Sequence, residues 1–342
     1  MIILIDLQHP AHLHFFRHLI VDLQAEGHTV RVTGWQKDIL EELAAEHRIP
    51  MEIFGQSGGR LFTMGKALML RMFKLFFMMR KLKPDLVLSI GGTFVSIPAR
   101  ILRVRTYVFY DTEHAKVSNL LAYPFCTCVY VPRCYYRSIR WQHERYNGYH
   151  ELAYMHPDRF TPDVSVLAEA GIGTEEPFAI IRFVAWAAGH DIGHDGLSLS
   201  QKLQAVEEIS KYCRVVISAE GDLPVDLKDY GLQIPVARMH DLMYYAQLIF
   251  GESGTMPAEA SVLGVPSVYI NPLRLGYLEE QEREYGLVSN FRPDEFEQAL
   301  DRGVSILDGY DRSHWRAKGN ALVDDKVDVH AYLKELVLNG AA

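Results

Sequence analysis

Residues 250–270 combine a turn that suits an anion with a carboxylate that suits a sugar. Ser253-Gly254-Thr255 is predicted to form a turn between a strand and a short helix. Exposed backbone N–H groups and a helix N-terminus bind phosphate groups well. Glu259 falls inside the helix, about one turn later, where it can accept hydrogen bonds from vicinal hydroxyls. A phosphate site beside a diol site leads to the hypothesis of a nucleotide pocket.

Histidines cluster after the first predicted strand, residues 2–7. His9, His12 and His14 follow it within seven residues. Imidazoles transfer protons near neutral pH, but a histidine beside a helix start is often a cap or a packing residue. Both interpretations remain open from the sequence.

Two further strand ends in the first half carry residues of interest. Gly91-Gly92-Thr93 could let a phosphate approach the backbone, or it could be a plain tight turn. Asp111, Glu113 and His114 offer carboxylates and an imidazole that could act as a general base. They could equally cap the helix that follows and complement its dipole.

In the second half, the loop at 185–196 contains His190, Asp191, His194 and three glycines. Imidazole and carboxylate are good zinc ligands, but the glycines argue against a helix that would align the two histidines. We expect a glycine-rich loop that covers a ligand, with no metal site. Glu220 follows the next strand and is expected to face the ligand. P-loop and GxGxxG fingerprints are absent where they would be needed, which argues against an ATPase or a nicotinamide dehydrogenase.

Strands and helices alternate with short connections, so we predict doubly wound α/β domains. Ligands in such sheets bind at the carboxyl ends of the strands. A chain of 342 residues is long for one core, and residues 146–163 are rich in Tyr, His, Pro and Gly. We therefore predict domains at 1–150 and 151–342, with the C-terminal helices packing back on the first.

The element boundaries can be predicted in outline. The strand at 129–132 is expected to close the first sheet. In the second half we expect strands at 178–183, 215–218, 234–236 and 248–250, helices at 200–212 and 240–246, and final helical segments at 294–307 and 313–338.

The predicted helix at 61–83 has basic residues and no acidic ones. At about 100° per residue, one arc holds Leu68, Met69, Met72, Leu75, Phe76, Met79 and Leu82 and should pack on the sheet. The opposite arc mixes cations with apolar residues: Lys66, Arg71, Lys74, Arg80 and Lys81, with Leu70, Phe77 and Met78 and with Phe73 at its edge. This mixture suits an anionic membrane surface; the alternative is a covering helix, with the lysines reaching to solvent.

Composition and charge argue against several classes of protein. A net charge of −8 argues against nucleic acid as a partner. The N-terminus does not resemble a signal peptide, and no apolar run is long enough to span a bilayer. The four cysteines resemble neither a disulfide framework nor a complete zinc site. We expect a cytoplasmic protein, peripheral on the inner face of the membrane.

Two such α/β halves resemble the GT-B fold, with two Rossmann-like domains facing across a cleft. Residues 250–270 resemble the second-domain motif of two GT-B enzymes, the lipid-linked peptidoglycan N-acetylglucosaminyltransferase and UDP-N-acetylglucosamine 2-epimerase. The resemblance implies that Ser253, Gly254 and Thr255 bind the diphosphate, Glu259 the ribose, and the segment from His240 to Met243 the base. Gly91-Gly92 resembles the transferase's Gly-Gly turn, and residues 111–114 fall where it has an acceptor-side loop.

The whole chain resembles domain-of-unknown-function family 354 more closely. The matching features are Asp6, Pro10, His12, Phe15 and Phe16, the loop His190–His194, and Gly251–Met256. Two features of the GT-B enzymes are missing: the transferase's glycine-rich first loop, and the epimerase's N-terminal Thr-Arg-Pro-Glu pattern.

The resemblance implies a glycosyltransferase of polysaccharide biosynthesis that moves a sugar from a UDP-sugar to a lipid-linked or polysaccharide acceptor, without a bound metal or other cofactor. His12, Glu113 or His114 would be the catalytic base. His190, Asp191, His194, Glu220, His240 and Met243 would complete the donor site; His9, Gly91, Gly92, Thr93 and Asp111 would form the acceptor side. The alternatives are a UDP-sugar 2-epimerase and a catalytically silent nucleotide-sugar-binding protein.

Overall fold

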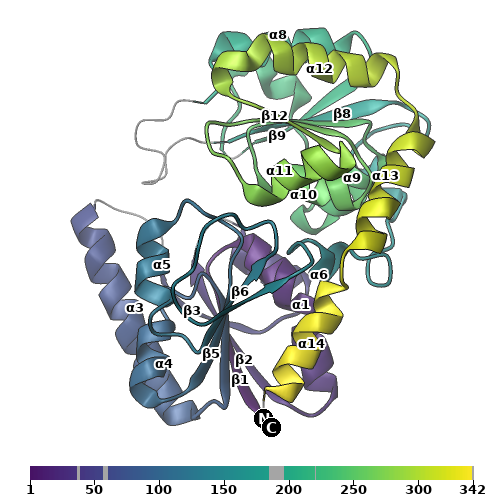
Figure 1. Cartoon of the computed structure of the whole chain (residues 1–342). Coiled ribbons are helices and arrows are strands. Elements are labelled where there is room, and N and C mark those ends of the chain that lie inside the picture. Colours follow the sequence, from purple (N-terminus) through teal and green to yellow (C-terminus); the bar gives the residue numbers. More distant parts are fainter. Residues whose placement is uncertain (37–38, 57–60, 185–195, 220, 341–342) are drawn as a thin grey trace. The chain divides into compact units, whose positions relative to one another are not determined.

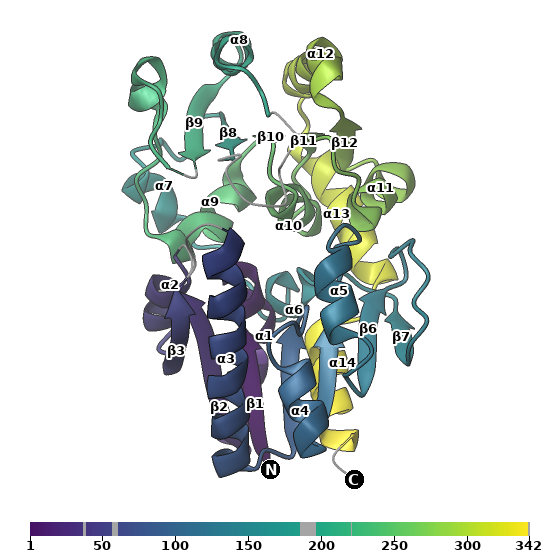
Figure 2. The same cartoon turned by 90° about the vertical axis from the view of Figure 1, so that its left-hand side faces the viewer.

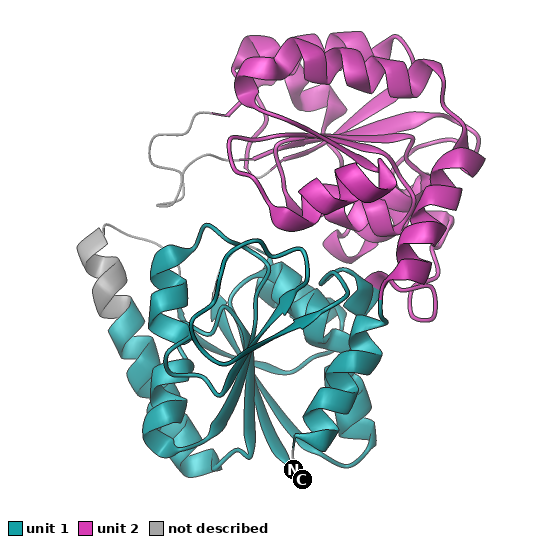
Figure 3. Ribbon diagram, in the orientation of Figure 1, with its two compact units in different colours: residues 1–154, 327–342 teal, residues 155–326 magenta. Residues whose placement is uncertain are grey.

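The computed structural model describes residues 1–36, 39–56, 61–184, 196–219 and 221–340 (Figure 1). It divides into two compact units, residues 1–154 with 327–342 and residues 155–326 (Figure 3). Each unit has its own parallel β-sheet with helices on both faces. The predicted fold class, two Rossmann-like α/β domains, is confirmed.

Seven strands build the sheet of unit 1, in the order β3-β2-β1-β4-β5-β6-β7, and every described pair is parallel. The strands are β1 (Ile2–Leu7), β2 (Thr29–Gln36), β3 (Met51–Gln56), β4 (Leu86–Ile90), β5 (Arg105–Phe109), β6 (Cys128–Pro132) and β7 (His143–Tyr146). The strand order reverses between β1 and β4. This is the topological switch point, where ligands bind in open α/β sheets.

Helices cover both faces of this sheet. They are α1 (Pro10–Ala25), α2 (Leu40–Glu46), α3 (Leu61–Leu82), α4 (Ser96–Leu102), α5 (Lys116–Ala122), α6 (Leu152–Met155) and α14 (Val329–Asn339). Helices α3 and α4 lie side by side on one face, and α1 and α14 lie on the other (Figure 2). Leu75 and Met79 of α3 pack with Leu4 and Val87 of the sheet, which fixes the inward side of α3.

Five parallel strands build the sheet of unit 2, in the order β12-β11-β10-β8-β9. They are β8 (Phe178–Phe183), β9 (Arg214–Ala219), β10 (Leu248–Gly251), β11 (Ser267–Ile270) and β12 (Val288–Phe291). The switch point lies between β8 and β10. The helices are α7 (Ser165–Glu169), α8 (Leu199–Ser210), α9 (Met239–Tyr245), α10 (Thr255–Val262), α11 (Gly276–Glu280), α12 (Phe296–Asp308) and α13 (Arg312–Asp325).

Three predictions about the elements were wrong, in position, type or extent. The strand at 129–132 does not close the first sheet, because β7 pairs with β6 beyond it. The strand predicted at 234–236 is absent; Val236–Arg238 is a 3-10 helix that leads into α9. The helical segment predicted at 313–338 is two helices, because Asp328 caps a new helix by accepting a hydrogen bond from the backbone N–H of Ala331.

The prediction for α3 was wrong for three side chains. Arg71 was placed on the outward arc, but it is 1% exposed. Its guanidinium lies 2.6 Å from Oδ1 of Asp6. It also lies beside the stacked rings of Trp35 and Phe94, at 4.9 and 4.6 Å from their centroids. The helical periodicity of α3 could not predict this contact, because Asp6 lies on strand β1.

Two methionines of α3 lie on the side of the helix opposite to the one predicted. Met69, expected against the sheet, is half exposed. Met78, expected outward, packs against the core. In the part of the chain that the structure describes, no helix is long and apolar enough to cross a membrane.

Candidate functional site

The turn Ser253-Gly254-Thr255 lies at the carboxyl end of β10, beside the switch point of unit 2. These three residues are partly exposed, whereas Gly251, Glu252 and Met256 around them are buried. Gly254 is the N-cap of α10 and brings no side chain to cap it, and the first turn of α10 has no acidic residue. The turn therefore has the positive, partly open character of a phosphate-binding helix start.

Gly251 permits a close approach of two strands. Its φ is +146°, and a Cβ built there would lie 2.1 Å from the carbonyl oxygen of Arg182 in β8. A side chain at residue 251 would therefore push β10 from β8 at the point where the turn begins.

Glu259 is held by a histidine from the neighbouring helix. Nε2 of His240, on α9, lies 2.9 Å from Oε1 of Glu259, on α10, and both side chains are largely buried. An imidazole N–H donating to a carboxylate fixes the orientation of that carboxylate. Glu259 is therefore a positioned acceptor one turn beyond the phosphate-suited residues.

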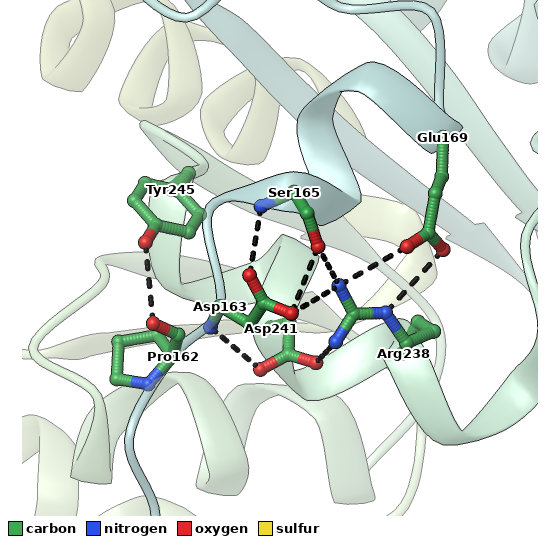
Figure 4. Close-up of polar contacts among 7 residues, drawn as sticks. All are labelled: Pro162, Asp163, Ser165, Glu169, Arg238, Asp241 and Tyr245. Atoms are coloured by element: carbon green, nitrogen blue, oxygen red, sulfur yellow. Dashed lines mark hydrogen bonds and ion pairs between the residues drawn. The ribbon is translucent and has the colours of Figure 1, made fainter.

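A charged network around Arg238 fixes α9, which carries His240 (Figure 4). The guanidinium donates to Asp241 at 2.5 Å, to Asp163 at 3.1 Å and to Glu169 at 3.3 Å. Asp241 also accepts the backbone N–H of Asp163, at 3.0 Å. Arg238 thus connects the start of α9 to residues 163–169. His240, the partner of Glu259, follows two residues after Arg238.

Glu252 joins the two strands of the switch point. Its side chain is 1% exposed and accepts the backbone N–H of Val184 at 3.2 Å and that of Leu197 at 2.7 Å. Nζ of Lys202 lies 3.8 Å away. On the other side, the amide of Asn271 donates to the carbonyl oxygen of Glu252 at 2.8 Å. The residue before the turn therefore fixes the ends of β8, β10 and β11 together.

The remaining donor-side predictions have different outcomes. Met243 is fully buried in the core of unit 2, so its side chain cannot reach a ligand in this structure. His190, Asp191, His194 and Glu220 lie outside the described residues.

The histidines after β1 have distinct positions. Nδ1 of His9 accepts the backbone N–H of Ala11, at 3.2 Å, and caps α1. Nδ1 of His12 accepts the backbone N–H of Gln8, also at 3.2 Å. His14 is buried and stacks on Tyr154, with ring centroids 5.2 Å apart. His9 and His12 thus lie at the switch point of unit 1, while His14 packs in the interior.

Gly91 and Gly92 form a tight turn at the end of β4. Both have positive φ, +76° and +67°, and a Cβ at residue 92 would lie 2.5 Å from Val108. Thr93 is buried. The geometry alone accounts for both glycines, and it places the turn beside the β1 loop at the switch point.

Asp111 pairs with a histidine that the sequence did not single out. Oδ2 of Asp111 lies 3.1 Å from Nδ1 of His150, and Oδ1 accepts the hydroxyl of Thr112 at 3.0 Å. Burial raises the pKa of Asp111, but the charge of His150 and these hydrogen bonds outweigh it and hold the pKa below its usual value. Glu113 is fully buried, and its carboxylate accepts the backbone N–H of Tyr136 at 3.4 Å; His114 is partly exposed.

Sequence reasoning missed Glu252, Asn271 and His150. Glu252 and Asn271 directly follow strands β10 and β11, so their position was a usable signal. His150 gave none, because it is 39 residues from Asp111 and the fold alone brings them together.

The family described as "Protein of unknown function (DUF354)" matches residues 1–284. The chain belongs to this family. An uncharacterised protein of Methanocaldococcus jannaschii, MJ0665, is 21% identical, and the match covers 82% of this chain and 85% of that protein.

Solved structures are similar over the full length. A UDP-GlcNAc 2-epimerase from Neisseria meningitidis, bound to UDP-GlcNAc, has a TM-score of 0.66 at 12% identity, covering 99% of this chain and 100% of that one. The glycosyltransferase VinC, in complex with dTDP, has a TM-score of 0.62 at 13% identity, covering 98% of each chain. Both are GT-B proteins, and at this identity the likeness establishes the GT-B fold of this family member.

Proposed function

We propose that this DUF354 protein is a GT-B glycosyltransferase that uses a UDP-sugar as donor. The main support is the arrangement at the switch point of unit 2. A partly exposed turn at a helix start is followed one turn later by Glu259, which His240 holds at 2.9 Å. Similar proteins of this fold have been solved with UDP-GlcNAc and with dTDP.

In this proposal Ser253, Gly254 and Thr255 bind the diphosphate through backbone N–H groups and hydroxyls. Glu259 accepts hydrogen bonds from the ribose hydroxyls. The leaving diphosphate gains negative charge as the glycosidic bond breaks, and fixed N–H donors stabilise that charge. The protein would then need no bound metal ion or other cofactor for the transfer.

The acceptor is proposed to be activated by residues of unit 1. Because Nδ1 of His12 accepts a backbone N–H, the neutral ring carries its proton on Nε2. His12 therefore suits the role of hydrogen-bond donor better than that of base. Of the other two predicted bases, Glu113 is fully buried and His114 is partly exposed, so we assign the base to His114. The acceptor class we propose is a lipid-linked sugar or a polysaccharide.

The second candidate is a UDP-sugar 2-epimerase, favoured by the similarity to several solved epimerases. Incubating the full chain with UDP-GlcNAc alone separates the candidates. Release of UDP only when an acceptor is added supports the transferase, whereas conversion to a second UDP-sugar without acceptor contradicts it. Binding of UDP-GlcNAc without turnover on any acceptor class supports a catalytically silent binding protein and contradicts the transferase proposal.

The base assignment has its own test. His114→Ala should lower kcat at least about tenfold, as loss of a general base does, with little change in the affinity for UDP. His14→Gln, which changes a buried histidine of the same unit, is the comparison for general damage to the fold. Equal kcat in His114→Ala and the wild type would contradict the assignment.

A further inference from the structure

Helix α3 presents four large apolar side chains to solvent. Met69, Leu70, Phe73 and Phe77 are 50%, 55%, 56% and 62% exposed. At about 100° per residue they fall within an arc of about 100°. Single exposed apolar residues are common, but a continuous stripe of four on one helix marks an interaction surface.

Cations border this stripe. Lys74, Arg80 and Lys81 are exposed on the same helix, and α3 contains no acidic residue. The buried Arg71 holds the opposite side of α3 to the sheet through Asp6. The stripe therefore faces outward as part of the fold.

The neighbouring helix continues the surface. Ile101 on α4 is 65% exposed, and Arg100 and Arg103 beside it are exposed. Helix α4 lies against α3 on the same face of the sheet (Figure 2). We call the exposed side chains of residues 69–81 and 100–105 the α3–α4 face.

A groove lies between the end of α3 and the end of α4. Its volume is about 470 Å³, and Arg80, Lys83, Arg103 and Arg105 line it. The acidic residue in its wall, Asp85, accepts the backbone N–H of Ile2 at 2.7 Å. Four cations around one groove suit a phosphate-bearing headgroup.

The charge of this region differs from that of the whole chain. Residues 61–110 contain nine lysines and arginines and one acidic residue, in a chain of net charge −8. A second copy of the chain is a poor occupant, because symmetric self-association would bring the same cations together. Apolar side chains mixed with cations match the interface of an anionic bilayer, where the rings enter the acyl boundary and the cations stay with the phosphates.

We propose that the α3–α4 face binds the surface of an anionic lipid bilayer. Phe73 and Phe77 enter the boundary of the acyl chains, and the cations of α3 and α4 contact the headgroups. This attachment does not depend on sugar transfer, and its test uses no turnover.

The test is sedimentation of the full chain with vesicles of phosphatidylcholine alone and with vesicles that also contain phosphatidylglycerol. Wild type should bind only the anionic vesicles. Phe73→Ser with Phe77→Ser should weaken that binding about tenfold or more, because the apolar area that enters the bilayer is lost. Lys74→Glu with Lys81→Glu should abolish it, because both charges now repel the surface.

The matched control is Val225→Ser with Lys228→Glu, which removes an 80% exposed valine and an exposed lysine of unit 2. It should bind as the wild type does. Equal binding to neutral vesicles, no binding to either kind, or equal binding by the phenylalanine variant would overturn the proposal. So would a wild-type dimer in light scattering that the phenylalanine variant loses, since that identifies a second copy as the occupant.

Discussion

His240 and Glu259 form a buried pair across α9 and α10, with 2.9 Å between Nε2 and Oε1. The pair carries two consequences. Loss of Glu259 would leave a buried imidazole without its acceptor, so Glu259→Ala mixes a change in binding with a change in stability. Glu259→Gln keeps an oxygen for His240 and removes the charge, which makes it the sharper variant.

Glu252 should be a positioning residue for the turn. Glu252→Ala leaves the N–H groups of Val184 and Leu197 without their acceptor, and we expect a loss of about 2–4 kcal/mol in the free energy of unfolding. Lys202→Met removes the cation 3.8 Å from Glu252 but leaves both backbone hydrogen bonds in place, so it should cost less than Glu252→Ala. Urea unfolding of the two variants measures the difference, and equal losses would show that the backbone contacts are not the reason.

Arg71 and Asp6 should depend on each other. Arg71→Met leaves the carboxylate of Asp6 buried without its cation, and we expect a loss of about 3–5 kcal/mol in the free energy of unfolding. Arg71→Met combined with Asp6→Leu removes both charges and should recover most of that loss. Urea unfolding of the single and double variants gives the coupling energy, and additive effects would contradict a direct pair.

Asp111 should make unit 1 sensitive to acid. The pKa of Asp111 is lower in the folded protein than its ordinary value of 3.8, so its contribution to stability is complete above that value and is lost as the pH falls through the lower pKa. Asp111→Asn should remove this dependence, whereas the exposed Asp222→Asn should not. Thermal unfolding between neutral and acidic pH checks it; the same acid dependence in Asp111→Asn and wild type would refute the role of the pair with His150.

Much of the fold followed from local pattern. Buried strands such as Phe178–Phe183 were predicted with their observed bounds, because a short, mostly apolar run between turns is typical of a buried strand. The turn at Ser253–Thr255 and the helix carrying Glu259 were also predictable, because Gly, Ser and Pro mark their ends.

The rest depended on distant partners. From the sequence, Arg71 was predicted to be a surface cation. In the fold it contacts Asp6, Trp35 and Phe94, which lie outside α3. Strand β7 has the polar sequence His-Glu-Arg-Tyr and exists through its pairing with β6. Helical and strand periodicity describe neighbours along the chain. The contact of Arg71 with Asp6 and the pairing of β7 with β6 join distant residues, so periodicity could not predict them.

Unit 2 is proposed to bind a nucleoside diphosphate through the turn at Ser253–Thr255 and through Glu259. Titration calorimetry of UDP into the full chain tests it directly, with Glu259→Gln as the variant and the exposed Glu176→Gln as its control. We expect wild type and Glu176→Gln to bind UDP alike and Glu259→Gln to bind about tenfold more weakly or worse, with an unchanged unfolding temperature. Equal affinity of Glu259→Gln and wild type, or no binding of UDP by the wild type, would contradict it.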